Sequence, residues 1–121
     1  MKNLLINCDN NSFVKEYDRV IDSSIKDTKG KVSFYIYDDS QKDSLVLREQ
    51  KSVHMILNNI FDEKFIKYEL DSRKKKAKEN SFVIIICNKN KYDSKACLFL
   101  SKNEKKLNEN NMYYCIFNNK R

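Results

Sequence analysis

The chain has 121 residues, with 24 Lys and Arg against 17 Asp and Glu, a net charge of +7, four Cys, one Gly and no Pro or Trp. This length fits a single domain, and a hydrophobic content of 40% supplies enough side chains for a core, which excludes a chain disordered throughout. A single glycine excludes the glycine-rich loops of P-loop and dinucleotide-binding proteins, because several glycines are needed there to bring the backbone against phosphate.

The hydropathy pattern excludes a membrane span. The longest apolar run covers residues 82–87, far short of the roughly 20 residues that a spanning helix needs. Residues 1–15 lack the basic start and long apolar stretch of a secretory signal. We therefore expect a cytoplasmic protein in a reducing compartment, with no membrane partner.

The first half of the chain contains one helical pattern between short apolar segments. Residues 3–7 predict a strand, and apolar side chains at helical spacing predict a helix over 13–26 that ends before Gly30. Alternating residues over 31–38 predict a half-buried strand, and residues 45–47 predict its hairpin partner.

The second half begins with a second helical pattern and continues with strand patterns. Ser52 is a candidate N-cap, and the apolar positions over 53–61 fit the spacing of an amphipathic helix. Four strands are predicted after it, over residues 65–70, 82–87, 96–100 and 112–117.

The order of these elements predicts the fold class. We expect a single α+β domain over residues 1–121, with two helices on a mixed, mostly antiparallel sheet and extra C-terminal strands. Residues 82–87 are apolar on both faces, so this strand belongs in the middle of a sheet covered on both sides. Two helices cover only one face. The C-terminal strands should cover the other, with a shared core formed by Phe99, Leu100, Tyr114 and Ile116.

The element order resembles two RNA-binding folds. The first 70 residues follow the order of ferredoxin-like RNA-recognition domains, although residues 45–49 lack the aromatic side chains that stack bases there. Over residues 3–88 the order also resembles the eukaryotic-type L twenty-two large-subunit ribosomal protein family. The matching elements are a strand at 4–7, a helix at 12–26, a hairpin at 32–50, a helix at 52–61 and a hairpin at 65–87. This second resemblance implies a ribosomal RNA-binding protein.

The positive charge is concentrated in the C-terminal part of the chain. Residues 1–70 carry 11 Lys and Arg against 12 Asp and Glu, whereas residues 71–121 carry 13 against 5. Basic side chains cluster in segments predicted as loops. If consecutive strands pair as hairpins, segments 73–78 and 102–106 project from one end of the sheet and segment 89–95 from the other. The candidate nucleic-acid-binding residues are Arg73, Lys74, Lys75, Lys76, Lys78, Lys89, Lys91, Lys95, Lys102, Lys105 and Lys106.

Lysine-rich loops suit phosphate backbones, because each lysine is a flexible point charge that releases counterions when it meets a phosphate. We therefore predict a non-catalytic, basic RNA-binding protein that is a component or factor of a ribonucleoprotein particle such as the ribosome, with further protein partners in that particle. A lysine-rich genomic composition is the alternative explanation for the charge. The alternative function is a small viral or parasite protein-interaction module, an effector or inhibitor with no nucleic-acid role.

No catalytic or metal-binding pattern is present in the sequence, so we expect no enzyme and no cofactor. The four cysteines lack the paired short spacing of a zinc site, and we expect buried, reduced thiols at Cys8, Cys87, Cys97 and Cys115. His54, the sole histidine, falls beside the apolar stripe of the predicted second helix, which favours an exposed side chain over a catalytic base.

Three carboxylates lie close together in the segment after the second predicted strand. Asp38, Asp39 and Asp43 lack the glycine and terminal glutamate of a calcium loop. A solvated turn is therefore the better interpretation of this segment than a divalent-ion site.

Overall fold

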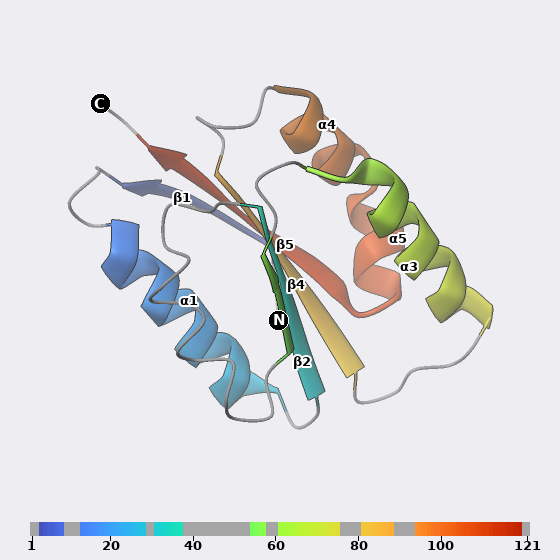
Figure 1. The fold of residues 1–121 in the computed structure, drawn as a ribbon, viewed down its shortest axis with the longest axis horizontal. Coiled ribbons are helices and arrows are strands. Elements are labelled where there is room, and N and C mark those ends of the chain that lie inside the picture. The colour runs from blue at the N-terminus through green and yellow to red at the C-terminus, as the bar shows by residue number, and fades with distance from the viewer. Residues whose placement is uncertain are drawn as a thin grey trace.

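The computed structural model describes residues 3–8, 13–28, 31–37, 54–57, 61–75, 81–88 and 94–119. In chain order, these residues form β1 (Leu4–Cys8), α1 (Phe13–Asp27), β2 (Lys31–Tyr37), β3 (His54–Leu57), α3 (Glu63–Lys75), β4 (Ser81–Asn88), α4 (Ser94–Lys102), α5 (Glu104–Glu109) and β5 (Met112–Asn119). Figure 1 shows these elements as one twisted sheet with helices on both faces. None of the described helices is long and apolar enough to cross a membrane.

The five strands form one sheet in the order β1-β5-β4-β2-β3, and every pair of neighbours is parallel. The prediction of a mostly antiparallel sheet is therefore wrong. Antiparallel neighbours can be joined by tight hairpins, whereas parallel neighbours need a long crossover. The antiparallel prediction follows from pairing consecutive strands as hairpins, whereas in the structure β4 and β5 are joined through two helices.

The helices lie in two layers. Helix α1 packs on one face of the sheet, here called the α1 face, and α3, α4 and α5 pack on the other, here called the three-helix face (Figure 1). The crossover through α1 runs from β1 toward the β3 edge, whereas those through α3 and through α4 and α5 run back toward β1. A crossover that runs the opposite way along the sheet and also lies on the opposite face keeps the same handedness. The three crossovers therefore have the same hand, as is the rule for connections between parallel strands.

Strand β4 is central, as the sequence predicts for residues 82–87. Its alternate side chains enter separate cores, with Ile84 and Ile86 toward α1 and Val83 and Ile85 toward the other three helices. All four are buried. A continuous β-branched run is typical of a parallel strand covered on both faces, because both sets of alternate side chains leave water.

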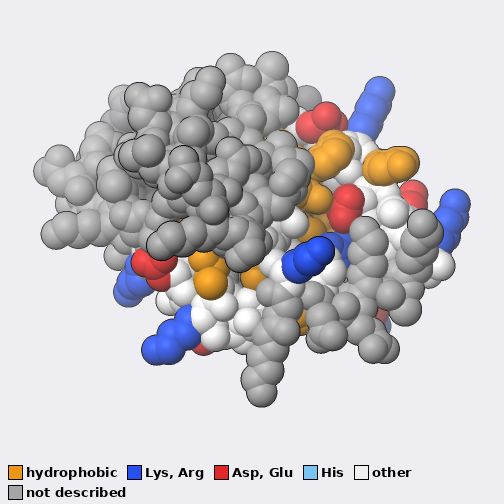
Figure 2. All heavy atoms as spheres, turned by 60° about the horizontal axis from the view of Figure 1, so that its bottom comes forward, with side chains coloured by type: hydrophobic (Ala, Val, Ile, Leu, Met, Phe, Trp, Pro, Cys, Tyr) orange, Lys and Arg blue, Asp and Glu red, His pale blue; other side chains and the backbone are white. Residues whose placement is uncertain are grey.

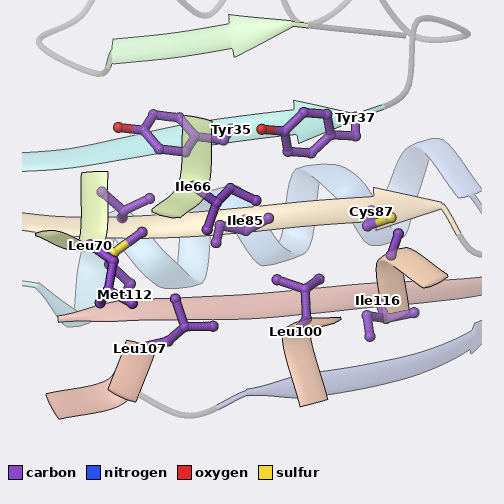
Figure 3. Packing of buried hydrophobic residues seen from close by; sticks show 12 residues of the cluster. Tyr35, Tyr37, Ile66, Leu70, Ile85, Cys87, Leu100, Leu107, Met112 and Ile116 are labelled. Atoms are coloured by element: carbon purple, nitrogen blue, oxygen red, sulfur yellow. The ribbon is translucent and has the colours of Figure 1, made fainter. Parts of the chain in front are cut away.

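The core of the three-helix face joins the C-terminal half of the chain to the sheet. Leu100 and Leu107 point from α4 and α5 toward side chains of β4 and β5, and Ile66 and Leu70 come from α3 (Figure 3). This cluster also contains the four residues predicted to share a core, namely Phe99, Leu100, Tyr114 and Ile116. That prediction is confirmed, but residues 96–100 reach the core as a helix rather than as a second layer of strands.

Three predicted elements have the wrong secondary structure. Residues 65–70 and 96–100 were predicted as strands and lie in α3 and α4, and the helix predicted over 53–61 is replaced by the strand His54–Leu57. In short apolar segments the helical and strand periods overlap. Ile66 and Leu70, for example, are both apolar and four residues apart, which suits one face of a helix as well as an alternating strand.

Helix α5 lies in a segment predicted as a loop, and the remaining described elements follow the sequence patterns. Five elements begin and end within two residues of the predicted bounds, namely β1, α1, β2, β4 and β5. The hairpin partner predicted at residues 45–47 lies outside the described residues.

Local polar contacts set the ends of the helices. Asp62 caps α3, because its Oδ1 accepts a hydrogen bond from the Phe65 amide at 3.1 Å. Helix α5 ends where the Asn110 side chain donates to the Lys106 carbonyl at 2.7 Å. Asn111 then takes a left-handed conformation with φ of 60°, which asparagine tolerates better than most residues, and the chain turns into β5.

Candidate functional site

The predicted lysines that the structure describes lie on helices rather than in loops. Lys74 and Lys75 are exposed in the last turn of α3, Lys102 is exposed at the end of α4, and Lys105 and Lys106 are exposed in α5. Lys95 is in the first turn of α4. The other lysines of the prediction, Lys76, Lys78, Lys89 and Lys91, lie outside the described residues.

Arg73 is not a surface contact for phosphate, and this part of the prediction is wrong. Its side chain is buried, with only 5% of the residue exposed. Its Nε donates to Glu69 Oε1 at 3.1 Å, and its Nη1 donates to the carbonyls of Ser81 at 2.8 Å and of Asn110 at 3.2 Å. Nη2 lies 3.3 Å from Ser81 Oγ. The guanidinium is therefore held by structural partners.

These bonds connect three elements that are distant in sequence. Arg73 belongs to the last turn of α3, Ser81 begins β4, and Asn110 follows the last residue of α5. We call this set of contacts the Arg73 junction. The junction joins the last turn of α3, which carries Lys74 and Lys75, to the end of α5. Lys106 lies one helical turn before that end, and its carbonyl accepts a hydrogen bond from Asn110. The prediction that segments 73–78 and 102–106 project from one end of the sheet assumes that consecutive strands pair as hairpins, and the parallel sheet contradicts that assumption.

Charge on the described surface is mixed. Figure 2 shows Lys and Arg side chains spread around one side of the molecule, with Asp and Glu side chains between them. Around the Arg73 junction the exposed lysines are Lys74, Lys75, Lys105 and Lys106, and the exposed carboxylates near them in sequence are Asp71, Glu104 and Glu109. The positive charge of these four lysines exceeds the negative charge of the three carboxylates by one.

A buried tyrosine extends the Arg73 junction. Burial, with the carboxylate of Glu69 beside it, raises the pKa of the Tyr35 hydroxyl from 10.0 to about 12. Burial also raises the pKa of Tyr37, and the carboxylate of Asp62 adds to this effect. Sequence reasoning missed that Glu69 lies between Arg73 and Tyr35 and interacts with both. The i, i+4 spacing of Glu69 and Arg73 was the available signal, but it is informative only on a helix.

A second polar junction fixes the first strand. Asn3 donates from Nδ2 to Glu104 Oε1 at 2.8 Å and accepts at Oδ1 from the Tyr114 amide at 3.0 Å. Burial raises the pKa of the Tyr114 hydroxyl, and the nearby Glu104 carboxylate raises it further. This arrangement ties the start of β1 to β5 and to α5.

The groups considered for catalysis or metal binding do not form a described site. Cys87 and Cys115 are buried, as predicted, and Cys97 is partly exposed. The backbone places His54 in strand β3 rather than on a helix. No group of three or more His, Cys, Asp and Glu side chains able to hold a metal ion occurs among the described residues. Asp38, Asp39 and Asp43 lie outside them.

A cavity of about 530 Å³ lies on the α1 face, and we call it the α1 cavity. The second half of α1 forms one wall, and β1, β5 and β4 form the floor. Arg19, Ser23, Ser24 and Asp27 contribute polar groups from the helix. No sequence pattern pointed to this cavity, because part of its floor comes from β4 and β5, which are distant from α1 in the sequence.

Comparisons with known proteins found no matching family model, no similar curated protein and no similar solved structure. The resemblance to the eukaryotic-type L twenty-two ribosomal family therefore stays a prediction.

Proposed function

We propose that the protein is a non-catalytic, cytoplasmic RNA-binding protein, a component or factor of a ribonucleoprotein particle such as the ribosome. It contacts the phosphate backbone through lysines at the ends of α3 and α5. The supporting observation is the Arg73 junction, in which a buried guanidinium bonds to Ser81 and Asn110 and so fixes two lysine-bearing helix ends together.

The chemistry of the exposed groups favours phosphate over base recognition. Lys74, Lys75, Lys105 and Lys106 are exposed point charges on rigid helix ends, and they need no fixed geometry to meet phosphate. Arg73 is engaged in the junction, so bidentate reading of a base edge is not part of the proposal. Binding should therefore tolerate many sequences.

The test compares two charge reversals of equal size. Lys74→Glu with Lys75→Glu changes the proposed contact, and Lys26→Glu with Lys31→Glu changes two exposed lysines on α1 and β2. Fluorescence anisotropy with labelled poly(U) at several salt concentrations measures affinity. We expect only the first variant to lose most binding, with the slope of log affinity against log salt falling by about 1.4 for two lost phosphate contacts on a single strand. Equal losses in both variants would contradict a localised interface.

The rival function is a protein-interaction module without a nucleic-acid role. It is favoured by large apolar side chains exposed on the outer helices, Tyr68 at 71% on α3 and Leu98 at 65% on α4. Sedimentation at increasing salt separates the two functions, because apolar self-association persists at high salt whereas polyanion binding is lost. Association that is insensitive to salt and abolished by Leu98→Lys would support the rival.

A further inference from the structure

We propose that the α1 cavity binds a small amphipathic organic anion, whose apolar body lies on the sheet and whose anionic group meets Arg19. This inference goes beyond RNA binding and concerns the opposite face of the sheet from the Arg73 junction. It rests on the origin of the cavity, the nature of its floor and the order of polar groups along α1.

The cavity exists because the apolar stripe of α1 is interrupted. Val20 and Ile21 are buried against the sheet, and the next turn should place another large apolar side chain four residues after Val20. That position holds Ser24, with Ser23 beside it, and both line the cavity. Protein interiors are otherwise close-packed, so the small Ser24 side chain at a sheet-facing position, beside the exposed Ser23, leaves space that a larger side chain would fill.

The floor is apolar and comes from three adjacent strands. Leu4 and Ile6 on β1, Ile84 on β4 and Cys115 on β5 all line the cavity. A volume of about 530 Å³ falls in the range of roughly 300 to 1,000 Å³ that is typical of small-molecule sites. An apolar floor of this kind stabilises a hydrocarbon chain or an aromatic ring by removing it from water.

Polar groups along the helical wall give the ligand a direction. Arg19, Ser23 and Asp27 are spaced by four residues and so lie on one stripe of α1. Arg19 and Asp27 are about 12 Å apart along the helix axis, at a rise of about 1.5 Å per residue. Arg19 attracts a carboxylate, sulfonate or phosphate group at one end of the cavity, and Asp27 repels it from the other.

The experiment uses two probes with the same chain and opposite charge, decanoate and decylamine, below their micellar concentrations. Isothermal titration calorimetry measures affinity, and amide shifts in ¹H–¹⁵N spectra locate the probe. We expect decanoate to bind with the largest shifts at Ile6, Ile84 and Cys115 and with its carboxylate at Arg19, whereas decylamine should not depend on Arg19, because its ammonium is attracted to Asp27 at the other end. Arg19→Gln should weaken decanoate binding by about tenfold, since hydrogen bonds to a charged group are stronger than neutral ones. The matched control Lys31→Gln should leave the affinity unchanged.

Ser24→Leu tests the cavity itself and should abolish decanoate binding by filling the space. Ser101→Leu, an exposed serine on α4, is its control and should not. Decylamine binding that Arg19→Gln weakens as much as it weakens decanoate binding, or decanoate binding that survives both Arg19→Gln and Ser24→Leu, would overturn the proposal. Both variants should keep wild-type affinity for poly(U), so failure here is distinguishable from failure of the RNA proposal. If Ser24→Leu does not fold, the exposed Arg19→Gln and its control decide the outcome.

Discussion

The two faces of the same sheet are closed in different ways. On the three-helix face, α3, α4 and α5 bury Leu100, Leu107 and Met112, and a buried Arg73 joins the helix ends to the start of β4. On the α1 face, α1 is the one described helix that covers the sheet. Its apolar contacts at Val20 and Ile21 are followed along the helix by Ser23 and Ser24, which line a cavity.

This difference separates stability from binding. A polar group is tolerated inside a protein when its hydrogen bonds are made, and Arg73 meets that condition through Glu69, Ser81 and Asn110. A cavity costs stability because its lining side chains lose packing partners. The three-helix face should therefore carry most of the folding energy, and the α1 face should keep the room for a ligand.

Removing the C-terminal segment should have the largest effect. Deletion of residues 96–121 removes most of α4, all of α5 and β5, and β5 lies between β1 and β4. The remaining chain would lose a core layer and leave β1 without its described partner. We expect no cooperative unfolding transition in urea, followed by circular dichroism. A truncated protein that is monomeric and unfolds cooperatively would refute the assignment of most folding energy to this face.

Breaking the Arg73 junction should have the next largest effect. Arg73→Ala leaves the Glu69 carboxylate and the carbonyls of Ser81 and Asn110 without their donor. Arg73 is buried but the Glu69 side chain is 17% exposed, so we expect less than the cost of breaking a fully buried pair, about 1 to 3 kcal/mol of unfolding free energy for the acceptors left without this donor. Urea denaturation measures the loss. The neighbouring exposed Lys74→Ala should change stability by less than about 0.5 kcal/mol, and a similar small change in Arg73→Ala would show that the junction is not structural.

The pH dependence of stability should also arise on the three-helix face. The pKa of Tyr35 is raised from 10.0 to about 12 in the folded protein, so its neutral form is favoured by folding. The corresponding stability is fully present below pH 10 and is lost as the pH rises from about 10 to 12. We expect Tyr35→Phe to reduce this alkaline loss in urea titrations at fixed pH values. An unchanged pH profile would show that the burial of this hydroxyl does not contribute.

Filling the α1 cavity should have the smallest effect, and it should be a gain. Ser24→Leu places apolar atoms where the helix faces the sheet, and cavity-filling substitutions commonly add about 0.5 to 2 kcal/mol of stability. Thermal and urea unfolding should show the increase. Ser101→Leu on the exposed side of α4 should give no gain. A destabilised Ser24→Leu would mean that the cavity is too constrained for a leucine side chain.

Sequence reasoning predicted some of the fold and little of the candidate sites. The sequence predicts strand 82–87 at the centre of the sheet, because a strand that is apolar on both faces is stable where both faces are covered. The sequence pattern groups Arg73 with the exposed lysines that follow it on α3, although Arg73 is buried. The charge pattern alone does not show which basic side chain is buried and hydrogen-bonded, because the partners of Arg73 include residues distant in sequence, such as Asn110.

By itself the sequence determined where apolar runs and helical stripes occur, and therefore the positions of β1, α1, β2, β4 and β5. Tertiary structure alone decided that residues 65–70 and 96–100 are helical, since short apolar segments satisfy either period until they meet a sheet. It also decided strand direction and the α1 cavity. Both depend on contacts between distant parts of the chain, such as Leu4 beside Cys115. The local hydropathy pattern does not indicate which distant segments pair.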